Sequence, residues 1–161
     1  MTLSRRTRGI TLTTAALAGA GSLLVAVPAA AHDNPLRLTT VAVPDRNTDL
    51  DLGAPGPSAG DGQVFLDDVQ RDGETVGTSA GSCMLAVFTE TRLVGACTAT
   101  LTLPEGTITT QGASDENPSV GPTRFVWAVT GGTGRYAGAG GEVTGTFRPG
   151  TDIVDLEIDL N

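Results

Sequence analysis

A glycine-rich segment between two strand-like runs limits what this chain can fold into more than any other feature. Residues 131–141 follow the apolar run 125–130 and lead into 142–147, where apolar and polar residues alternate. Glycine tolerates positive φ angles and close backbone approach, so the segment predicts a tight connection between two strands. The fragment 132–137 also fits the dinucleotide-binding pattern G-x-G-x-x-G/A. The glycines after it disfavour the helix that this motif needs, so we reject that interpretation.

Short strand-like runs recur along the rest of the chain, and no segment has a convincing helical period. The last run is the clearest, because its apolar residues alternate with acids, which predicts one buried and one solvated face. Many short strands separated by turn residues indicate a β-sandwich or a β-barrel. We expect eight strands, at 36–43, 63–66, 76–88, 93–103, 107–111, 124–130, 136–147 and 151–160.

Two of the expected boundaries bear on the candidate site. The run 63–66 is expected to end at Asp67 and Asp68, because aspartate disfavours strands. The segment 112–123 is polar and contains two prolines, and is expected to form a loop.

Residues 1–31 have the pattern of a secretory signal peptide. A basic start is followed by an apolar stretch and by an A-x-A cleavage site at residues 29–31. The mature chain is therefore expected to begin at His32, to be secreted, and to keep no membrane anchor. We divide it into 32–60, a first strand and a loop rich in Pro, Gly and Asp, and 61–161, the main part of a single β-barrel domain. Whether export uses the general or the twin-arginine route stays open.

The mature chain is strongly acidic. The full sequence has 10 arginines, no lysine and 18 acids, which give a net charge of −8. The expected signal peptide removes three arginines and no acid, which leaves a net charge of −11. Such a surface repels phosphate groups, so we expect neither nucleic acid nor an anionic membrane as a partner.

The two longest expected strands, 76–88 and 93–103, are apolar or small on both faces. Met84, Ala86 and Phe88 are expected on one face, and Leu85 and Val87 on the other. One face would line a barrel interior, and the other would contact a partner subunit or a covering loop.

The two cysteines fall on this hairpin. A turn centred on Glu90 would place Cys83 and Cys97 directly opposite each other, close enough for a disulfide bond. Cysteine pairs in exported proteins are usually oxidised, so we expect this bond.

Candidate catalytic and binding residues are few. The single histidine, His32, makes a Ser-His-Asp site improbable, and no metal-ligand spacing is present. Asp67 and Asp68 are candidate acid–base groups, but neighbouring strand residues point to opposite faces, so at most one would face a cavity. Arg135 and Tyr136 are candidate ligand contacts, as is Trp127. For Trp127 a place in the core is an open alternative.

Two segments resemble known sequence motifs. Val76 to Cys83 resembles the V-G-x-x-A-G-x-C segment of plant allene oxide cyclases, and Ala128 to Ala139 is similar to their A-I-T-G-G-x-G-x-[FY]-x-G-A segment. The second segment also resembles the G-G-T-G-K-F motif of dirigent proteins, and Val64 to Asp68 resembles a signature in their first half. The resemblance covers residues 60–147. It implies a calycin-type, eight-stranded antiparallel β-barrel, usually trimeric, with an internal ligand cavity and without a metal or organic cofactor.

The known active sites of this family do not carry over. Dirigent proteins have arginines where this chain has Ala137 and Gly140, and the first strand here lacks the glutamate of the plant cyclases. The cysteine of the cyclase motif corresponds to Cys83, which we expect to be bonded to Cys97. The resemblance therefore implies the scaffold, and the active site has to be found in this chain's own residues.

The leading functional hypothesis is a secreted, homotrimeric barrel that binds a small apolar molecule and steers its cyclisation or coupling. We expect hydrophobic carboxylic or phenolic ligands, with Arg135 near the mouth. A non-catalytic binding barrel and a structural extracellular barrel stay open as alternatives.

Overall fold

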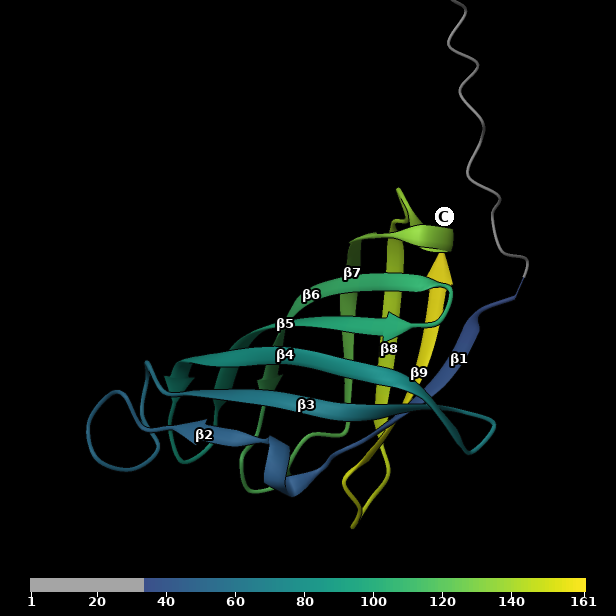
Figure 1. Ribbon diagram of the computed structural model, residues 1–161. Coiled ribbons are helices and arrows are strands. Elements are labelled where there is room, and N and C mark those ends of the chain that lie inside the picture. The colour runs from purple at the N-terminus through teal and green to yellow at the C-terminus, as the bar shows by residue number, and fades with distance from the viewer. Residues whose placement is uncertain (1–33) are drawn as a thin grey trace, which may run out of the picture.

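The computed structural model describes residues 34–161, so the expected signal peptide and its cleavage site at His32 lie outside the described residues. No helix within 34–161 is long and apolar enough to cross a membrane. The elements, shown in Figure 1, are β1 (Leu36–Val41), η1 (Pro44–Arg46), β2 (Thr48–Leu50), β3 (Gly62–Arg71), β4 (Glu74–Phe88), β5 (Leu93–Leu103), β6 (Gly106–Glu116), β7 (Arg124–Gly132), η2 (Gly134–Tyr136), β8 (Gly141–Phe147) and β9 (Ile153–Leu160).

The strands form a closed antiparallel barrel. Hydrogen-bonded neighbours follow the order β1-β9-β8-β7-β6-β5-β4-β3, and β1 closes the barrel by pairing with β3 as well. The short strand β2 extends the sheet beyond β3. The predicted eight-stranded antiparallel β-barrel is therefore confirmed, with one additional strand.

The two ends of the barrel are filled differently. The turns after β3, β5 and β7 gather at one end, where buried side chains from every barrel strand except β4 pack around Tyr136. Ile108, Val69 and Ile158 are fully buried there. The alternation predicted for the last strand is confirmed, because Leu156, Ile158 and Leu160 are all buried. We call this the closed end, and the opposite end the mouth.

Three of the expected strands differ most from the prediction, and other boundaries differ by about two residues. β3 does not end at Asp67 but continues to Arg71, because its pairing with β4 runs through Asp67 and Asp68. β6 continues past Gln111 to Glu116, because β5 pairs with it along its whole length. The run 136–147 is divided into η2 and β8. In the first two cases strand pairing outweighs the local preference of the residues.

The glycine-rich segment forms the predicted tight connection between β7 and β8. Gly134 has a φ of 59° and Gly141 a φ of 130°, values that favour glycine. A side chain on Gly141 would overlap the backbone carbonyl of Asp159, so the chain passes too close to β9 for any other residue.

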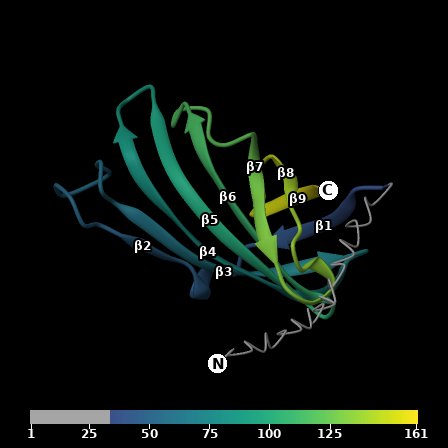
Figure 2. The same cartoon turned by 90° about the horizontal axis from the view of Figure 1, so that it is seen from above.

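The pairing of β6 with β7 is short. It ends at Gln111 and Ala128, and within the described residues 112–116 have no strand partner on that side. Figure 2 shows the two strands diverging toward the loop that joins them. The barrel wall is therefore fully paired at the closed end and opens between β6 and β7 at the mouth.

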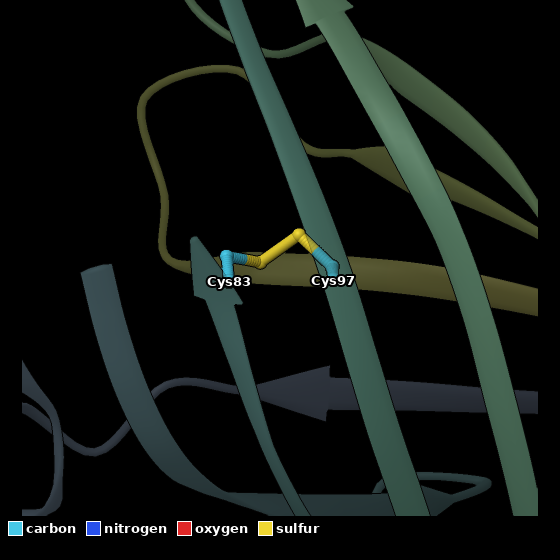
Figure 3. Close-up of a disulfide and its surroundings, with 2 residues drawn as sticks. All are labelled: Cys83 and Cys97. Atoms are coloured by element: carbon cyan, nitrogen blue, oxygen red, sulfur yellow. A yellow bond between two sulfur atoms is a disulfide. The ribbon is translucent and has the colours of Figure 1, made fainter. Parts of the chain in front are cut away.

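The predicted disulfide bond between Cys83 and Cys97 is present and links β4 to β5 (Figure 3). The two cysteines lie directly opposite each other with their Cα atoms 4.0 Å apart. The connection between the strands is one residue longer than expected, but β4 carries a bulge between Leu85 and Val87 that compensates. The predicted register at the cysteines is therefore correct.

The bulge also corrects the predicted faces of β4. Ala86 is the extra residue, so Val87 pairs with Val94 and Phe88 with Leu93. Phe88 thus points to the same side as Leu85, into the barrel, and not to the side of Met84 as predicted. Because a bulge inserts one extra residue, the side chains after it point to the opposite faces from those that strict alternation predicts.

Loss of the disulfide bond should destabilise the fold. Replacing both residues, as Cys83→Ala/Cys97→Ala, should lower the free energy of unfolding by about 3 kcal/mol, because the unfolded chain regains the entropy of an open loop. Urea denaturation measures this change. A reducing agent should cause a similar loss in the unsubstituted protein and none in the double variant. Equal stability of the two proteins under oxidising conditions would contradict a structural role for the bond.

Candidate functional site

A cavity of about 1480 Å³ occupies the mouth half of the barrel. The buried layer at the closed end forms its floor, with Leu101, Val143 and Leu156. Its walls are the inward residues of the strands, and the loops around 56–61, 120–123 and 148–152 surround its entrance. Because every strand alternates inward and outward residues, the lining follows from the register.

One wall of the cavity is aromatic. The rings of Phe125 and Trp127 stack with their centroids 4.2 Å apart, and Phe147 meets Phe125 edge to face at 6.0 Å. Both stacked rings lie over glycines of neighbouring strands. A side chain on Gly112 would overlap the indole of Trp127, and one on Gly145 would overlap the ring of Phe125. The two glycines thus leave the space that the stacked rings occupy.

The wall formed by β3, β4 and β5 also has an aromatic ring packed over a glycine, and it contains the disulfide bond as well. The ring of Phe65 on β3 lies over Gly81 on β4. Cys83 and Cys97 line the same cavity, so the bond is part of its surface. One further ring, that of Phe88, completes an apolar lining suited to a flat, largely apolar molecule.

Asp67 places a carboxyl group in this apolar lining. It faces the cavity, and its Oδ1 accepts a hydrogen bond of 3.2 Å from Nδ2 of Asn47. The Oδ1 atom of Asn47 in turn accepts from the backbone N–H of Leu66 at 3.1 Å, which fixes the amide orientation. Burial raises the pKa of Asp67, and the Asn47 hydrogen bond opposes that rise.

Asp68 lies on the opposite face of β3. Its carboxylate accepts a hydrogen bond of 2.6 Å from Arg46 on the outside of the barrel. Of the two predicted acid–base candidates, only Asp67 lines the cavity, in agreement with the expectation that at most one would do so.

Glu116 is a second carboxyl in the cavity, and the sequence analysis missed it. It ends β6, lines the cavity, and has its pKa raised by burial. Sequence analysis placed it in a polar loop. One sequence feature could have shown that the strand continues. Every second residue from Thr110 to Glu116 keeps the alternation of inward and outward side chains, with Thr110, Gly112, Ser114 and Glu116 on the inward side.

Trp127, a candidate ligand contact, lines the cavity and also packs against the buried core, the alternative that the sequence left open. Its indole Nε1 is shielded from solvent and has no hydrogen-bond partner among the described residues. This donor is therefore not open to the cavity in the structure, and Trp127 lines the cavity with other atoms of its ring.

The structure does not bring Arg135 and Tyr136 together with Asp67 and Trp127. Both belong to η2 and line a separate pocket of about 250 Å³ at the closed end. Tyr136 is only 6% exposed and is part of the core. In the same pocket Arg71 donates a hydrogen bond of 2.8 Å to Glu105, which lowers the pKa of Glu105.

Asp61 organises the loop that borders the mouth. Its carboxylate accepts hydrogen bonds from the backbone N–H groups of Leu52 and Gly53, each at 3.0 Å, and of Ser58 at 2.6 Å. These donors, that of Gly53 most strongly, lower the pKa of Asp61. The buried carboxylate therefore fixes the shape of the entrance.

The geometry suits proton transfer to or from an apolar molecule held against the aromatic wall. Asp67 and Glu116 are carboxyls in surroundings that favour the protonated form, as acid–base groups require. Among residues 34–161 no three His, Cys, Asp or Glu side chains are grouped as a metal ion would need.

The sequence matches the family described as "Allene oxide cyclase barrel like domain" over residues 39–154. None of the curated proteins is significantly similar to the chain. Among solved structures, a "Pyocyanin demethylase" is 29% identical with a TM-score of 0.68, and the match covers 79% of this chain and 99% of that one.

Two more distant structures share the fold. The Diels-Alderase AbmU from Streptomyces koyangensis is 19% identical with a TM-score of 0.60, and the match covers 79% of this chain and 63% of that one. The pterocarpan synthase dirigent protein GePTS1 is 17% identical with a TM-score of 0.59, and the match covers 78% and 87%.

The Asp67 carboxyl should lower stability at neutral pH. Because its pKa is raised in the folded protein, the folded state binds the proton more tightly than the unfolded state, and stability falls as pH rises through this pKa. Asp67→Asn, which resembles the protonated acid, should therefore increase the free energy of unfolding at neutral pH. The gain should shrink as the pH is lowered toward the ordinary aspartate range.

Denaturant unfolding across a pH series measures this difference. Asp68→Asn is the matched control, because it makes the same charge change on the outer face, where it removes the contact with Arg46 and should give no such gain. A loss of stability in Asp67→Asn at neutral pH would contradict the assignment.

Proposed function

Because the chain belongs to the allene oxide cyclase barrel-like family, we propose that it binds a small, largely apolar molecule in the barrel and steers its cyclisation or coupling. One observation carries the proposal. The mouth-half cavity of about 1480 Å³ has a stacked aromatic wall and also contains two half-buried carboxyls, Asp67 and Glu116. A purely structural barrel has no need of a hollow interior with costly buried acids.

The rate enhancement in such a site comes mainly from restricting the substrate. A flexible molecule pressed flat against Phe125 and Trp127 keeps few conformers, and holding a reactive one removes much of the entropic barrier to ring closure. Exclusion of water from the floor of the cavity protects a reactive intermediate from hydrolysis.

Asp67 is the proposed proton-handling group, with Glu116 as the second. A ring closure or coupling that moves a proton needs one group to accept it and one to return it. Carboxyls with raised pKa values perform both steps more readily near neutral pH than exposed ones do. Asn47 positions the Asp67 carboxyl toward the cavity and is not itself a proton carrier.

A second candidate is chemistry on a flat aromatic ring without ring formation. It is favoured by the 29% identity to the pyocyanin demethylase structure, a protein that the match covers almost completely. The aromatic wall suits such a substrate as well as it suits a cyclising one.

Ligand binding is tested with the protein's own fluorescence. Trp127 is the single tryptophan of the chain and lies in the wall of the cavity. A neutral aromatic probe, naphthylmethanol, should change Trp127 emission and raise the melting temperature. Gly112→Ala should weaken binding about tenfold, because the added methyl group displaces the indole.

Gly131→Ala is the matched control, since a side chain there meets only ordinary contacts and the affinity should not change. If neither naphthylmethanol nor larger neutral aromatics alter emission or melting temperature, the structural interpretation replaces this one. If a natural ligand binds but is not chemically converted, the protein is a non-catalytic binding barrel and not a cyclase.

We also propose that the protein acts outside the cell, as a homotrimer. Export is supported by the signal-like residues 1–31 and by the disulfide bond. Assembly is supported by the outer face of β4 and β5, where the paired residues Ala80 and Thr100, Ser82 and Thr98, and Met84 and Ala96 are all uncharged. A surface without charge is typical of an interface centre, and is notable in so acidic a chain.

The trimer is tested by light scattering at micromolar concentration. Three times the mass of one chain is expected, and added salt should not change it because apolar contacts are not screened. Ala96→Glu should dissociate the trimer, whereas Thr144→Glu, on the outer face of β8, should not. A monomer mass for the unsubstituted protein would contradict the proposal.

A further inference from the structure

The charges around the cavity are almost all negative. Six of the residues that line it are acids and one is an arginine. Asp67 and Glu116 lie on the inner wall, and Asp61 lies beneath the entrance loop. The acids are Asp49, Asp51, Asp61, Asp67, Glu116 and Asp152, and the arginine is Arg148.

The one arginine in the lining is already paired. Its Nε and its terminal nitrogen donate hydrogen bonds of 2.8 Å and 2.6 Å to the two oxygens of Asp155. A bidentate pair of this kind occupies one of the edges through which arginine binds carboxylates, and the acid offsets the charge of the arginine. Arg46, beside Asp67, donates to Asp68 on the outer face. Within the described residues the cavity therefore has no unpaired basic side chain to hold an anion.

The walls of the cavity strengthen the effect of these acids, because most of the residues that line it are apolar or uncharged. Negative charge in a cavity with low-dielectric walls is focused toward its interior. The acids of the lining thus favour a ligand of positive charge.

We propose that the cavity selects a flat, apolar organic cation, such as a protonated amine or a positively charged nitrogen heterocycle on an aromatic skeleton. This inference rests on the proposed function and names its ligand class. The aromatic skeleton stacks on Phe125 and Trp127, and the positive charge lies toward Asp67 and Glu116. An organic cation is thus proposed in place of the carboxylic or phenolic ligands expected from sequence. Those ligands were expected to contact Arg135, which lies at the closed end of the barrel.

A series of probes with one skeleton and three charges tests the proposal. Naphthylmethylammonium, naphthylmethanol and naphthoate are titrated calorimetrically, with Trp127 emission reporting that each one enters the cavity. The cation should bind about tenfold more tightly than the neutral probe, and the anion more weakly than either. The advantage of the cation should fall as salt is added.

Two variants locate the origin of the preference. Asp67→Asn and Glu116→Gln should each reduce the ratio of cation to neutral affinity several-fold. Asp159→Asn is the matched control. It removes the same charge from an exposed position that does not line the cavity, and should leave the ratio as it is.

The outcomes separate this inference from the function on which it rests. If none of the three probes binds, the proposed binding function itself fails. If naphthylmethanol binds but the cation has no advantage, or if the anion binds as tightly as the cation, only the ligand class is overturned. A preference that survives in both cavity variants would also overturn it, because the selecting charge would then lie elsewhere.

Discussion

Closure of the barrel through β1 is the constraint on which the rest of this structure depends. Residues 39–41 pair with β9 on one side and with β3 on the other, and so join the two ends of the sheet. Once the sheet is closed, every second side chain of each strand has to point inward. Closure thus fixes, over the whole chain at once, which residues form the floor, which line the cavity and which meet solvent.

The hollow half of the barrel depends on where large and small inward residues fall. At the closed end, inward leucine, isoleucine and valine side chains meet across the barrel axis and exclude water. Toward the mouth the inward positions of three neighbouring strands hold Gly81, Gly95 and Gly112. Glycines leave the space in which aromatic rings lie along the wall instead of crossing the interior. The cavity is therefore specified by residues that have no side chain.

Sequence reasoning succeeded where one local rule decides the outcome. Alternation predicts the buried face of β9, and symmetry about Glu90 predicts the disulfide bond. It was wrong where strand pairing decides, as at Asp67 and Asp68, two consecutive aspartates that suggest the end of a strand but that pairing with β4 keeps extended. Phe88 was assigned to the same face as Met84 because a bulge leaves no pattern in the sequence. The place of Arg135 at the closed end depends on the direction of every strand around the barrel, which no local motif encodes.

The divergence of β6 from β7 has a consequence for solubility. Residues 112–116 of β6 form the end of a sheet edge, and open edges can recruit strands from other molecules. Here the edge ends in Asp115 and Glu116, and Asp115 is bound on the outside by Arg92 through two hydrogen bonds of 2.9 Å and 2.6 Å. Consecutive acids at the end of an edge repel an incoming strand. The opening that gives access to the interior is thereby protected against edge-to-edge aggregation by the same glutamate that faces the cavity.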